Sequence, residues 1–331
     1  MRVVIDSAIP FIKGVLEPYA EVIYSPAQHI DSDLVRESDA LIIRTRTRCD
    51  ASLLASSKVK FIATATIGTD HIDLEWCKKA GITVSSAAGC NARGVLQWVA
   101  AALRQTTMML QSAPRDLTLG VVGVGNVGSL VVEYARRWGF KVLACDPPRQ
   151  EREGGEFCTF DEIASGSDII TLHTPLDSST KHLINERVIS TLTPHCVILN
   201  ASRGGVVDNL AVSHSGHPYI FDVWEREPNI LSDVLQGATL ATPHIAGYSI
   251  QGKANATAMS IRALALHFRL PLTEWYPEGV SRGVKRDISW EDMCSSIDNY
   301  FSIKEQTLQL KSAPESFESL RDNYHYREEY F

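Results

Sequence analysis

Three segments of the chain carry a cation, a carboxylate and an imidazole in patterns that suit acid–base chemistry. They read Asn200-Ala-Ser-Arg203-Gly-Gly, Asp222-Val-Trp-Glu-Arg-Glu227-Pro and Ala241-Thr-Pro-His244-Ile-Ala-Gly-Tyr. Arginine binds a carboxylate through its planar fork, and imidazole exchanges a proton near neutral pH. A glutamate beside the histidine would favour the imidazolium and fix its orientation. The trio predicts a site that grips the carboxylate of a small hydroxy acid and removes its hydroxyl proton.

Each residue of the trio also has an ordinary structural explanation. His244, after Thr-Pro, could be a satisfied turn histidine, and Glu227, beside Pro228, could begin a helix. All three nevertheless follow apolar runs that read as strands, and parallel sheets bind ligands beyond the carboxyl ends of their strands. We therefore expect the three side chains to share one site.

A glycine loop upstream of the trio predicts a dinucleotide site. Gly123-Val-Gly125-Asn126-Val127-Gly128 follows an apolar strand candidate and opens a helical pattern. Such glycines permit a tight turn and close approach to a pyrophosphate. Asp146 ends the next strand candidate, where an acid accepts hydrogen bonds from a ribose 2′-hydroxyl and repels a 2′-phosphate. The pattern predicts NAD rather than NADP, although a structural glycine turn with a solvated aspartate would look alike.

Alternating strand and helix patterns set these motifs in an α/β fold. We expect two Rossmann-like or flavodoxin-like parallel-sheet domains and a small C-terminal α+β module. Residues 1–91, joined by a returning helix over about 250–268, would bind substrate, and residues 92–249 would bind NAD. Residues 270–331 would form the module, with dimerisation as its expected role. The strand candidates are Val3–Ile5, Val22–Tyr24, Leu41–Ile43, Phe61–Ala63, Ile82–Val84, Leu119–Val122, Lys141–Ala144, Asp168–Leu172, Cys196–Asn200, Tyr219–Phe221 and Thr239–Ala241; helices are expected at Phe11–Leu16, Leu53–Ser57, Ile72–Lys79, Ala92–Gln111 and Gly252–Phe268.

Bulk composition excludes several classes of partner. The 331 residues carry a net charge of -7, which argues against nucleic acid or an anionic membrane as the main partner. The chain has 7 cysteines in scattered positions, a pattern typical of reduced thiols in the cytoplasm. His214 and His217 lack a third ligand nearby, so we expect no metal.

The order of these motifs resembles the D-isomer-specific 2-hydroxyacid dehydrogenases over roughly residues 1–268. The matching segments are the glycine loop, Asp146, His173-Thr-Pro, Asn200-Ala-Ser-Arg203-Gly, Asp222-Val-Trp-Glu-Arg-Glu227-Pro and Thr242-Pro-His244. The resemblance implies that Arg203 and Glu227 are active-site residues and that His244 donates or accepts the proton. Substrate contacts would come from Thr45, Thr66 and Tyr248. Implied cofactor contacts are Gly123, Gly125, Asn126, Val127, Gly128, Asp146, Thr174, Ala201, Ser202, Arg203, Asp222 and Gly247.

Further segments resemble family members whose substrate is a small phosphorylated 2-hydroxy acid. They are Thr64-Ala-Thr66-Ile-Gly-Thr-Asp-His71-Ile-Asp, Ala88-Gly-Cys90-Asn91-Ala, Cys145-Asp-Pro-Pro-Arg149, His244-Ile-Ala-Gly247-Tyr248-Ser and Leu320-Arg-Asp-Asn-Tyr324. A homodimer is the implied assembly. Two alternatives stay open, namely a dehydrogenase of the 3-phosphoglycerate or glyoxylate type and a non-catalytic NAD-sensing protein on the same fold. Arg44, Arg46 and Arg48 alternate after a strand candidate, but we expect Arg46 and Arg48 to be solvated.

Overall fold

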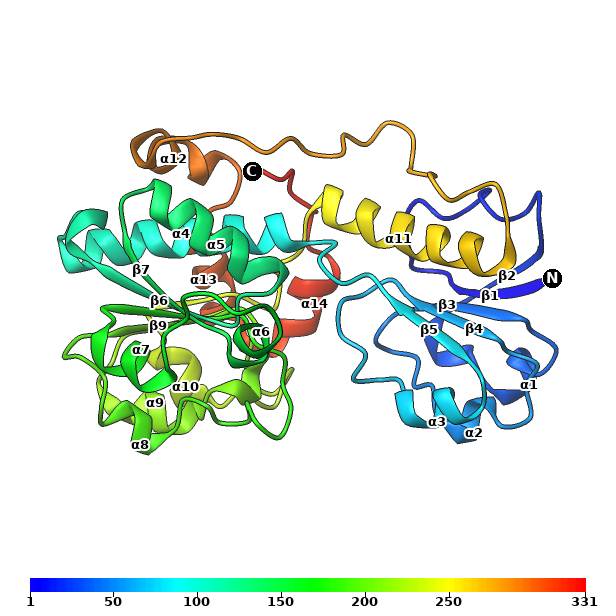
Figure 1. Cartoon of the computed structure of the whole chain (residues 1–331), viewed down its shortest axis with the longest axis horizontal. Coiled ribbons are helices and arrows are strands. Elements are labelled where there is room, and N and C mark those ends of the chain that lie inside the picture. Colours follow the sequence, from blue (N-terminus) through cyan, green and yellow to red (C-terminus); the bar gives the residue numbers. More distant parts are fainter. The chain divides into compact units, whose positions relative to one another are not determined.

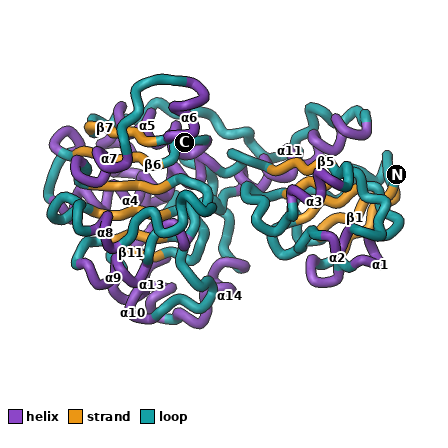
Figure 2. Tube along the Cα trace, turned by 60° about the horizontal axis from the view of Figure 1, so that its bottom comes forward, coloured by secondary structure: helices purple, strands orange, loops and turns teal.

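The structure, a computed structural model, describes residues 1–331 and divides the chain into two compact units. The first unit holds Met1–Asn91 and Ile250–Gly283, and the second holds Ala92–Ser249 and Val284–Phe331. Each unit contains its own parallel sheet, whose strands lie side by side in Figure 2. The expectation of two parallel-sheet α/β domains is therefore confirmed. The assignment of one unit to substrate and the other to NAD stays a prediction.

The first unit is built on a five-stranded sheet in the order β2-β1-β3-β4-β5. Apolar side chains of β1, β3 and β4 are almost completely buried because the sheet is covered on both faces. Helix α11 packs against β4 and β5. The elements are β1 (Arg2–Asp6), β2 (Glu21–Ser25), α1 (Ser32–Val35), β3 (Ala40–Ile43), α2 (Ala51–Leu54), β4 (Phe61–Thr64), α3 (Leu74–Lys79), β5 (Thr83–Ser86) and α11 (Ile250–Phe268).

The helix expected at Phe11–Leu16 is wrong. These residues form turns, with φ of 62° at Phe11 and 83° at Gly14. Pro10 and Pro18 bracket the segment and Gly14 interrupts it, so few residues remain in which backbone hydrogen bonds could repay the cost of starting a helix. Ile12 and Leu16 are nonetheless buried in the core of the first unit. Their helix-like spacing reflects burial without a helix.

The second unit is built on a six-stranded sheet in the order β11-β10-β9-β8-β6-β7. All of its strand pairs are parallel. Helices α4 and α5 lie together on one face, and α7 lies on the other (Figure 1). The strands are β6 (Thr118–Val122), β7 (Lys141–Cys145), β8 (Ile169–Leu172), β9 (Val197–Asn200), β10 (Tyr219–Phe221) and β11 (Leu240–Ala241); the helices up to β11 are α4 (Ala92–Leu110), α5 (Asn126–Arg137), α6 (Pro147–Glu153), α7 (Phe160–Gly166), α8 (Glu186–Ile189), α9 (Asn209–Ser215) and α10 (Ser232–Gly237).

The chain order of the second sheet creates a switch point between β6 and β8. From β6 the chain moves outward to β7 and then crosses to β8 on the other side of β6. Loops that leave the carboxyl ends of such neighbouring strands diverge, and the crevice between them binds ligands. The glycine loop follows β6, Asp146 follows β7 and Thr174 follows β8. The predicted dinucleotide residues therefore lie where the topology favours a ligand.

The C-terminal segment differs from the expected α+β module. Residues 270–283 pack with the first unit and residues 284–331 with the second. The latter contain α12 (Trp290–Ser296), α13 (Ile303–Ser312) and α14 (Phe317–Asp322), with no strand. Met293, Ile297 and Phe331 are buried in the core shared with α4 and α5. The tail bears too few apolar residues for a core of its own, and it buries them against the existing helices.

No helix meets the length and apolarity that a bilayer crossing requires.

Candidate active site

Two glycines of the loop, Gly123 and Gly128, have no room for a side chain, whereas the third, Gly125, faces open space. A Cβ on Gly128 would lie 2.0 Å from the Gly123 carbonyl oxygen, and one on Gly123 would lie 2.8 Å from the Thr174 nitrogen. Gly123 also has φ of +83°, a conformation that favours glycine. At Gly125 a Cβ would meet nothing within 4 Å. The space above Gly125 is therefore open for a ligand that approaches the backbone closely.

Helix α5 begins at this open position. Gly125 is its N-cap and offers no side chain to the first amide groups of the helix. Uncapped amides at a helix amino terminus bind anions such as a pyrophosphate. Gly125 and Asn126 are exposed and Val127 is half-buried. The loop thus fits the diphosphate of a dinucleotide.

Asp146 is held beside the glycine loop. Its carboxylate accepts the Val124 amide at 2.7 Å and the Arg149 amide at 2.9 Å. Arg149 in turn donates to the Val124 carbonyl at 2.7 Å and to Ser129 Oγ at 2.9 Å. A carboxylate has about four acceptor positions, so Asp146 can receive ribose hydroxyls while it keeps both amides. Its position fits the predicted contact with the ribose.

Thr174 adds an unsatisfied group at the same end of the sheet. Its Oγ1 is buried and has no hydrogen-bond partner in the chain. The preceding residue, His173, places Nε2 3.0 Å from Thr171 Oγ1, and burial lowers the pKa of its imidazole. His173 is thus neutral near pH 7 and packs as part of the loop. Thr174 offers a hydroxyl to a bound cofactor, which would relieve the cost of its unpaired state.

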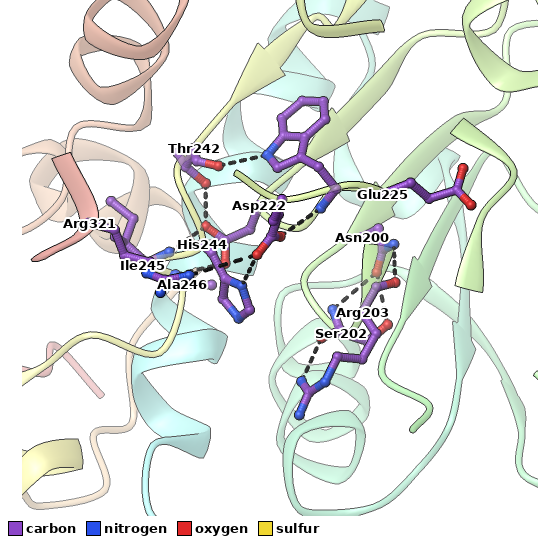
Figure 3. A network of polar contacts seen from close by, with 12 residues as sticks. Asn200, Ser202, Arg203, Asp222, Glu225, Thr242, His244, Ile245, Ala246 and Arg321 are labelled. Atoms are coloured by element: carbon purple, nitrogen blue, oxygen red, sulfur yellow. Dashed lines mark hydrogen bonds and ion pairs between the residues drawn. The ribbon is translucent and has the colours of Figure 1, made fainter. Parts of the chain in front are cut away.

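Arg203 lies on a loop that Asn200 organises. Asn200 is fully buried, and its Oδ1 accepts the Ser202 amide at 3.0 Å and Ser202 Oγ at 2.8 Å. Its Nδ2 donates to the Arg203 carbonyl at 3.0 Å, and Arg203 Nη1 donates to the Ser202 carbonyl at 2.8 Å. The bonded residues lie at the end of β9 and directly after it, and their bonds orient the partly buried side chain of Arg203 (Figure 3). Ala201 is half-buried and Ser202 buried.

Glu227 and His244 form a close pair. His244 Nδ1 lies 2.7 Å from Glu227 Oε2, and Glu227 Oε1 accepts the Trp224 amide at 2.8 Å. Burial alone would raise the pKa of Glu227, but the hydrogen bond and charge of His244, with help from Trp224 and Arg321, hold that pKa below its ordinary 4.5. Glu227 is therefore ionised at neutral pH. Because Nδ1 faces Glu227, Nε2 is the ring nitrogen that can exchange a proton with a substrate.

Asp222 holds the loop that carries His244. Its buried carboxylate accepts the Ile245 amide at 2.8 Å, the Ala246 amide at 2.9 Å and the Thr242 hydroxyl at 2.5 Å (Figure 3). Burial raises the pKa of this carboxyl. His244 has φ of 58°, a conformation that costs free energy in a non-glycine residue. The Asp222 contacts oppose that cost. The predicted cofactor contact of Asp222 stays a prediction, because its carboxylate bonds to the loop.

The remaining predicted residues lie in different units. Gly247 and Tyr248 are half-buried and follow His244 in the second unit. Thr45 and Thr66 belong to the first unit, where they follow β3 and β4. Thr45 is exposed, and Thr66 Oγ1 lies 2.6 Å from Thr64 Oγ1. The two threonines stay predicted substrate contacts.

Two of the three alternating arginines after β3 bond to acids of their own unit. Arg44 pairs with buried Asp6 at 2.8 Å, and exposed Arg48 pairs with Asp50 at 2.8 Å. Arg44 therefore supports the end of β1, and Arg48 lies at the surface.

Sequence reasoning missed the residues of the tail that lie beside Glu227 and Tyr248. Arg321 of α14 places Nη1 3.9 Å from Glu227 Oε2. Tyr324 and Tyr326 have ring centroids 6.2 and 6.1 Å from that of Tyr248. The available signal was Leu320-Arg-Asp-Asn-Tyr324, whose likeness to relatives we noted without assigning a role. Nothing local in that segment indicates that it lies beside a histidine far back in the chain.

The chain is similar to a family of known enzymes. Residues 91–246 match the family model described as D-isomer specific 2-hydroxyacid dehydrogenase, NAD binding domain. The chain is 42% identical to the erythronate-4-phosphate dehydrogenase of Bacteroides thetaiotaomicron, with 99% of this chain and 97% of the relative covered. It is 43% identical to the enzyme of the same name from Bacteroides fragilis, again over 99% and 97%.

Solved structures share the fold. The 3-phosphoglycerate dehydrogenase of Entamoeba histolytica, solved with bound NAD+, is 26% identical with a TM-score of 0.66, over 81% of this chain and 95% of that one. The NAD-binding family model and the NAD+-bound neighbour confirm the prediction of NAD as the cofactor.

Proposed function

Because the chain belongs to the D-isomer specific 2-hydroxyacid dehydrogenase family, we propose that it oxidises 4-phospho-D-erythronate with NAD. The product is (3R)-3-hydroxy-2-oxo-4-phosphooxybutanoate, and the reaction serves pyridoxal 5′-phosphate synthesis. The observation that carries the reaction type is the 2.7 Å contact between His244 Nδ1 and Glu227 Oε2. The choice of substrate is supported by the names of the full-length relatives.

The trio divides the work in this proposal. His244 takes the 2-hydroxyl proton at Nε2, and the ionised Glu227 stabilises the imidazolium that forms. Arg203 binds the substrate carboxylate and polarises the 2-oxygen. NAD, when bound, supplies the acceptor for the hydride that leaves C2. It would be held by the Gly123–Gly128 loop, Asp146 and Thr174, with Ala201–Arg203, Asp222 and Gly247 as further predicted contacts.

A substrate comparison tests this proposal. Purified protein and NAD should form NADH, followed at 340 nm, when 4-phosphoerythronate is supplied. D-3-Phosphoglycerate and the reverse reaction with glyoxylate and NADH serve as comparisons. Turnover of 4-phosphoerythronate with the highest kcat/KM supports the assignment. Turnover of 3-phosphoglycerate or glyoxylate alone would reject it in favour of those dehydrogenase types, and binding of NAD without any turnover would favour a sensor.

The preference for NAD over NADP rests on Asp146 in this proposal. Asp146→Ala should lower the NAD-to-NADP ratio of kcat/KM on the order of 10-fold, since a 2′-phosphate would no longer meet a carboxylate. The same change removes the acceptor for the Val124 and Arg149 amides. Asp146→Asn is the matched control, because it keeps an acceptor and removes only the charge. An unchanged ratio in both variants would place the selectivity elsewhere.

We further propose a cytoplasmic homodimer, as the resemblance implies. Light scattering coupled to size-exclusion chromatography tests the assembly, and a monomer at micromolar concentration would contradict it.

A further inference from the structure

Arg321 is the one guanidinium of the tail that lies against the His244–Glu227 pair. Its Nη1 is 3.9 Å from Glu227 Oε2, and its side chain is only 21% exposed. Its Nε is buried and has no hydrogen-bond partner in the chain. Burial raises the pKa of the hydroxyl of Tyr248, a predicted substrate contact, and the charge of Arg321 partly opposes this rise. Arg321 therefore lies near two residues of the proposed site without being fully bonded to either.

The position of Arg321 relative to His244 is set by the tail that follows it. Arg327 is 7% exposed and donates to the carbonyl oxygens of Ile245 and Gly94 at 3.0 Å and of Tyr248 at 3.1 Å. The Ile245 and Tyr248 carbonyls belong to the loop that carries His244, and Gly94 belongs to α4. Ser249 Oγ donates to Glu329 at 2.8 Å in the same region. The tail is thus bonded to the His244 loop, and α14 is held beside it.

The unsatisfied guanidinium suits an anionic ligand. Arginine carries five N–H donors in a planar fork, and a 3.9 Å separation is too long for a hydrogen bond. A phosphate can accept two parallel bonds from such a fork. Glu227 is already bonded to His244 and Trp224, so Arg321 can bond to a ligand without depriving Glu227 of its partners.

Figure 3 draws two arginines, Arg203 and Arg321, on different sides of the His244 ring. Arg203 follows β9 and Arg321 lies on α14. A phosphorylated hydroxy acid has two anionic groups, a carboxylate next to the reacting carbon and a phosphate at the far end. With Arg203 on the carboxylate, the phosphate still requires a cation, and the predicted substrate residues Thr45, Thr66 and Tyr248 supply none.

We propose that Arg321 binds the phosphate of the substrate and that the C-terminal tail is thereby part of the substrate site. The inference rests on the proposed function, since it assumes a substrate with a carboxylate and a phosphate. Arg321 is a specificity-determining residue in this view: it selects for the phosphorylated acid. The competing role is electrostatic support of Glu227, which would act on every substrate alike.

Kinetics with a pair of substrates separates these roles. D-Erythronate has a hydroxyl where 4-phosphoerythronate has its phosphate, and both present the same carbon to His244. Arg321→Met should raise KM for 4-phosphoerythronate on the order of 10- to 100-fold, the range expected for loss of a charge-assisted hydrogen bond. Its kcat/KM for D-erythronate should stay within about 3-fold of the unsubstituted protein. Arg321→Lys keeps the charge but loses the planar fork, so its KM for 4-phosphoerythronate should lie between those of the unsubstituted protein and of Arg321→Met.

Controls make each outcome decisive. Arg115→Met removes an arginine whose side chain is 84% exposed and outside the site, and it should change neither KM. Thermal unfolding and NAD titration check that each variant folds and binds cofactor. If Arg321→Met fails to fold, Arg321→Lys still tests the inference, because the fork-specific loss should appear for the phosphorylated substrate alone.

The results that overturn the inference differ from those that overturn the proposed function. An equal loss on both substrates, carried by kcat, would assign Arg321 to support of Glu227. Unchanged kinetics on both would remove Arg321 from the site. If the unsubstituted protein does not turn over 4-phosphoerythronate, the proposed function fails first. Inorganic phosphate then tests the cation site directly, through a rise in unfolding temperature that Arg321→Met abolishes; no rise in the unsubstituted protein would reject it.

Discussion

Two glutamates of one loop in the second unit each pair with a histidine at the same nitrogen–oxygen distance, but the two pairs differ in their surroundings. His244 Nδ1 lies 2.7 Å from Glu227, and His182 Nε2 lies 2.7 Å from Glu225. The two glutamates are two residues apart in the segment that follows β10. The histidine side chains are 35% and 36% exposed. Neither the distance nor the exposure of the imidazole tells the pairs apart.

The two pairs differ in the partner of the glutamate oxygen that does not face the histidine. Glu225 Oε2 accepts the Asn209 amide at 3.1 Å, and the Glu225 amide donates to Asn209 Oδ1 at 3.0 Å. This reciprocal contact ties the loop to the start of α9. The Glu227 side chain is more buried than that of Glu225, and it lies 3.9 Å from Arg321. Its partner His244 lies on a loop that the Asp222 carboxylate holds in place. A histidine–carboxylate pair therefore indicates a catalytic site only when the second ring nitrogen can reach a substrate and cations that can bind the substrate lie nearby.

The largest expected difference between the pairs is the effect of removing each histidine. His244→Ala should lower kcat on the order of 10²- to 10⁴-fold, the usual contribution of a positioned general base. His182→Ala should leave kcat within about 3-fold, because that ring bonds to Glu225 and lies 3.9 Å from Asp208, outside the proposed site. Steady-state kinetics measures both, and NAD titration by fluorescence should give similar affinities. Equal losses in the two variants would refute the distinction.

The carboxylates should show the next largest difference. Glu227→Gln should lower kcat about 10- to 100-fold, since a neutral amide cannot compensate the imidazolium charge. The pKa of Glu227 is held below 4.5, so its carboxylate is charged above that pH and protonates only as the pH falls through the lowered value. The advantage over Glu227→Gln should thus persist from about pH 9 to pH 6, because Glu227 stays charged throughout this range. A pH–rate profile in which it vanishes near neutral pH would contradict this.

The smallest effect on turnover is expected at the other glutamate. Glu225→Gln should change kcat by less than about 3-fold but lower the free energy of unfolding by about 1 kcal/mol, since a partly exposed hydrogen bond between the loop and α9 is weakened. Urea unfolding followed by circular dichroism measures this loss. A large fall in kcat with unchanged stability would show that Glu225 takes part in the reaction.

A contrast between local sequence and distant packing also explains which parts of the fold were predictable. Strands such as β6, β8 and β10 are short apolar runs whose burial is set by local composition, and their predicted positions are confirmed. The turns at Phe11–Leu16 and the helical tail were missed. In both, apolar spacing indicated burial, but proline, glycine and distant packing partners decided the conformation.

By itself the sequence determined the residue types and their places at the ends of strands. A glycine loop after β6 and the loops with Arg203, Glu227 and His244 after β9, β10 and β11 can be read from neighbouring residues. Sheet order then brings three consecutive strands together. Only the tertiary structure decided that Glu227 rather than Glu225 faces His244, and that Arg321 and Arg327 of the tail join that loop. Hydrogen bonds depend on positions to within tenths of an ångström, and long-range packing sets those positions.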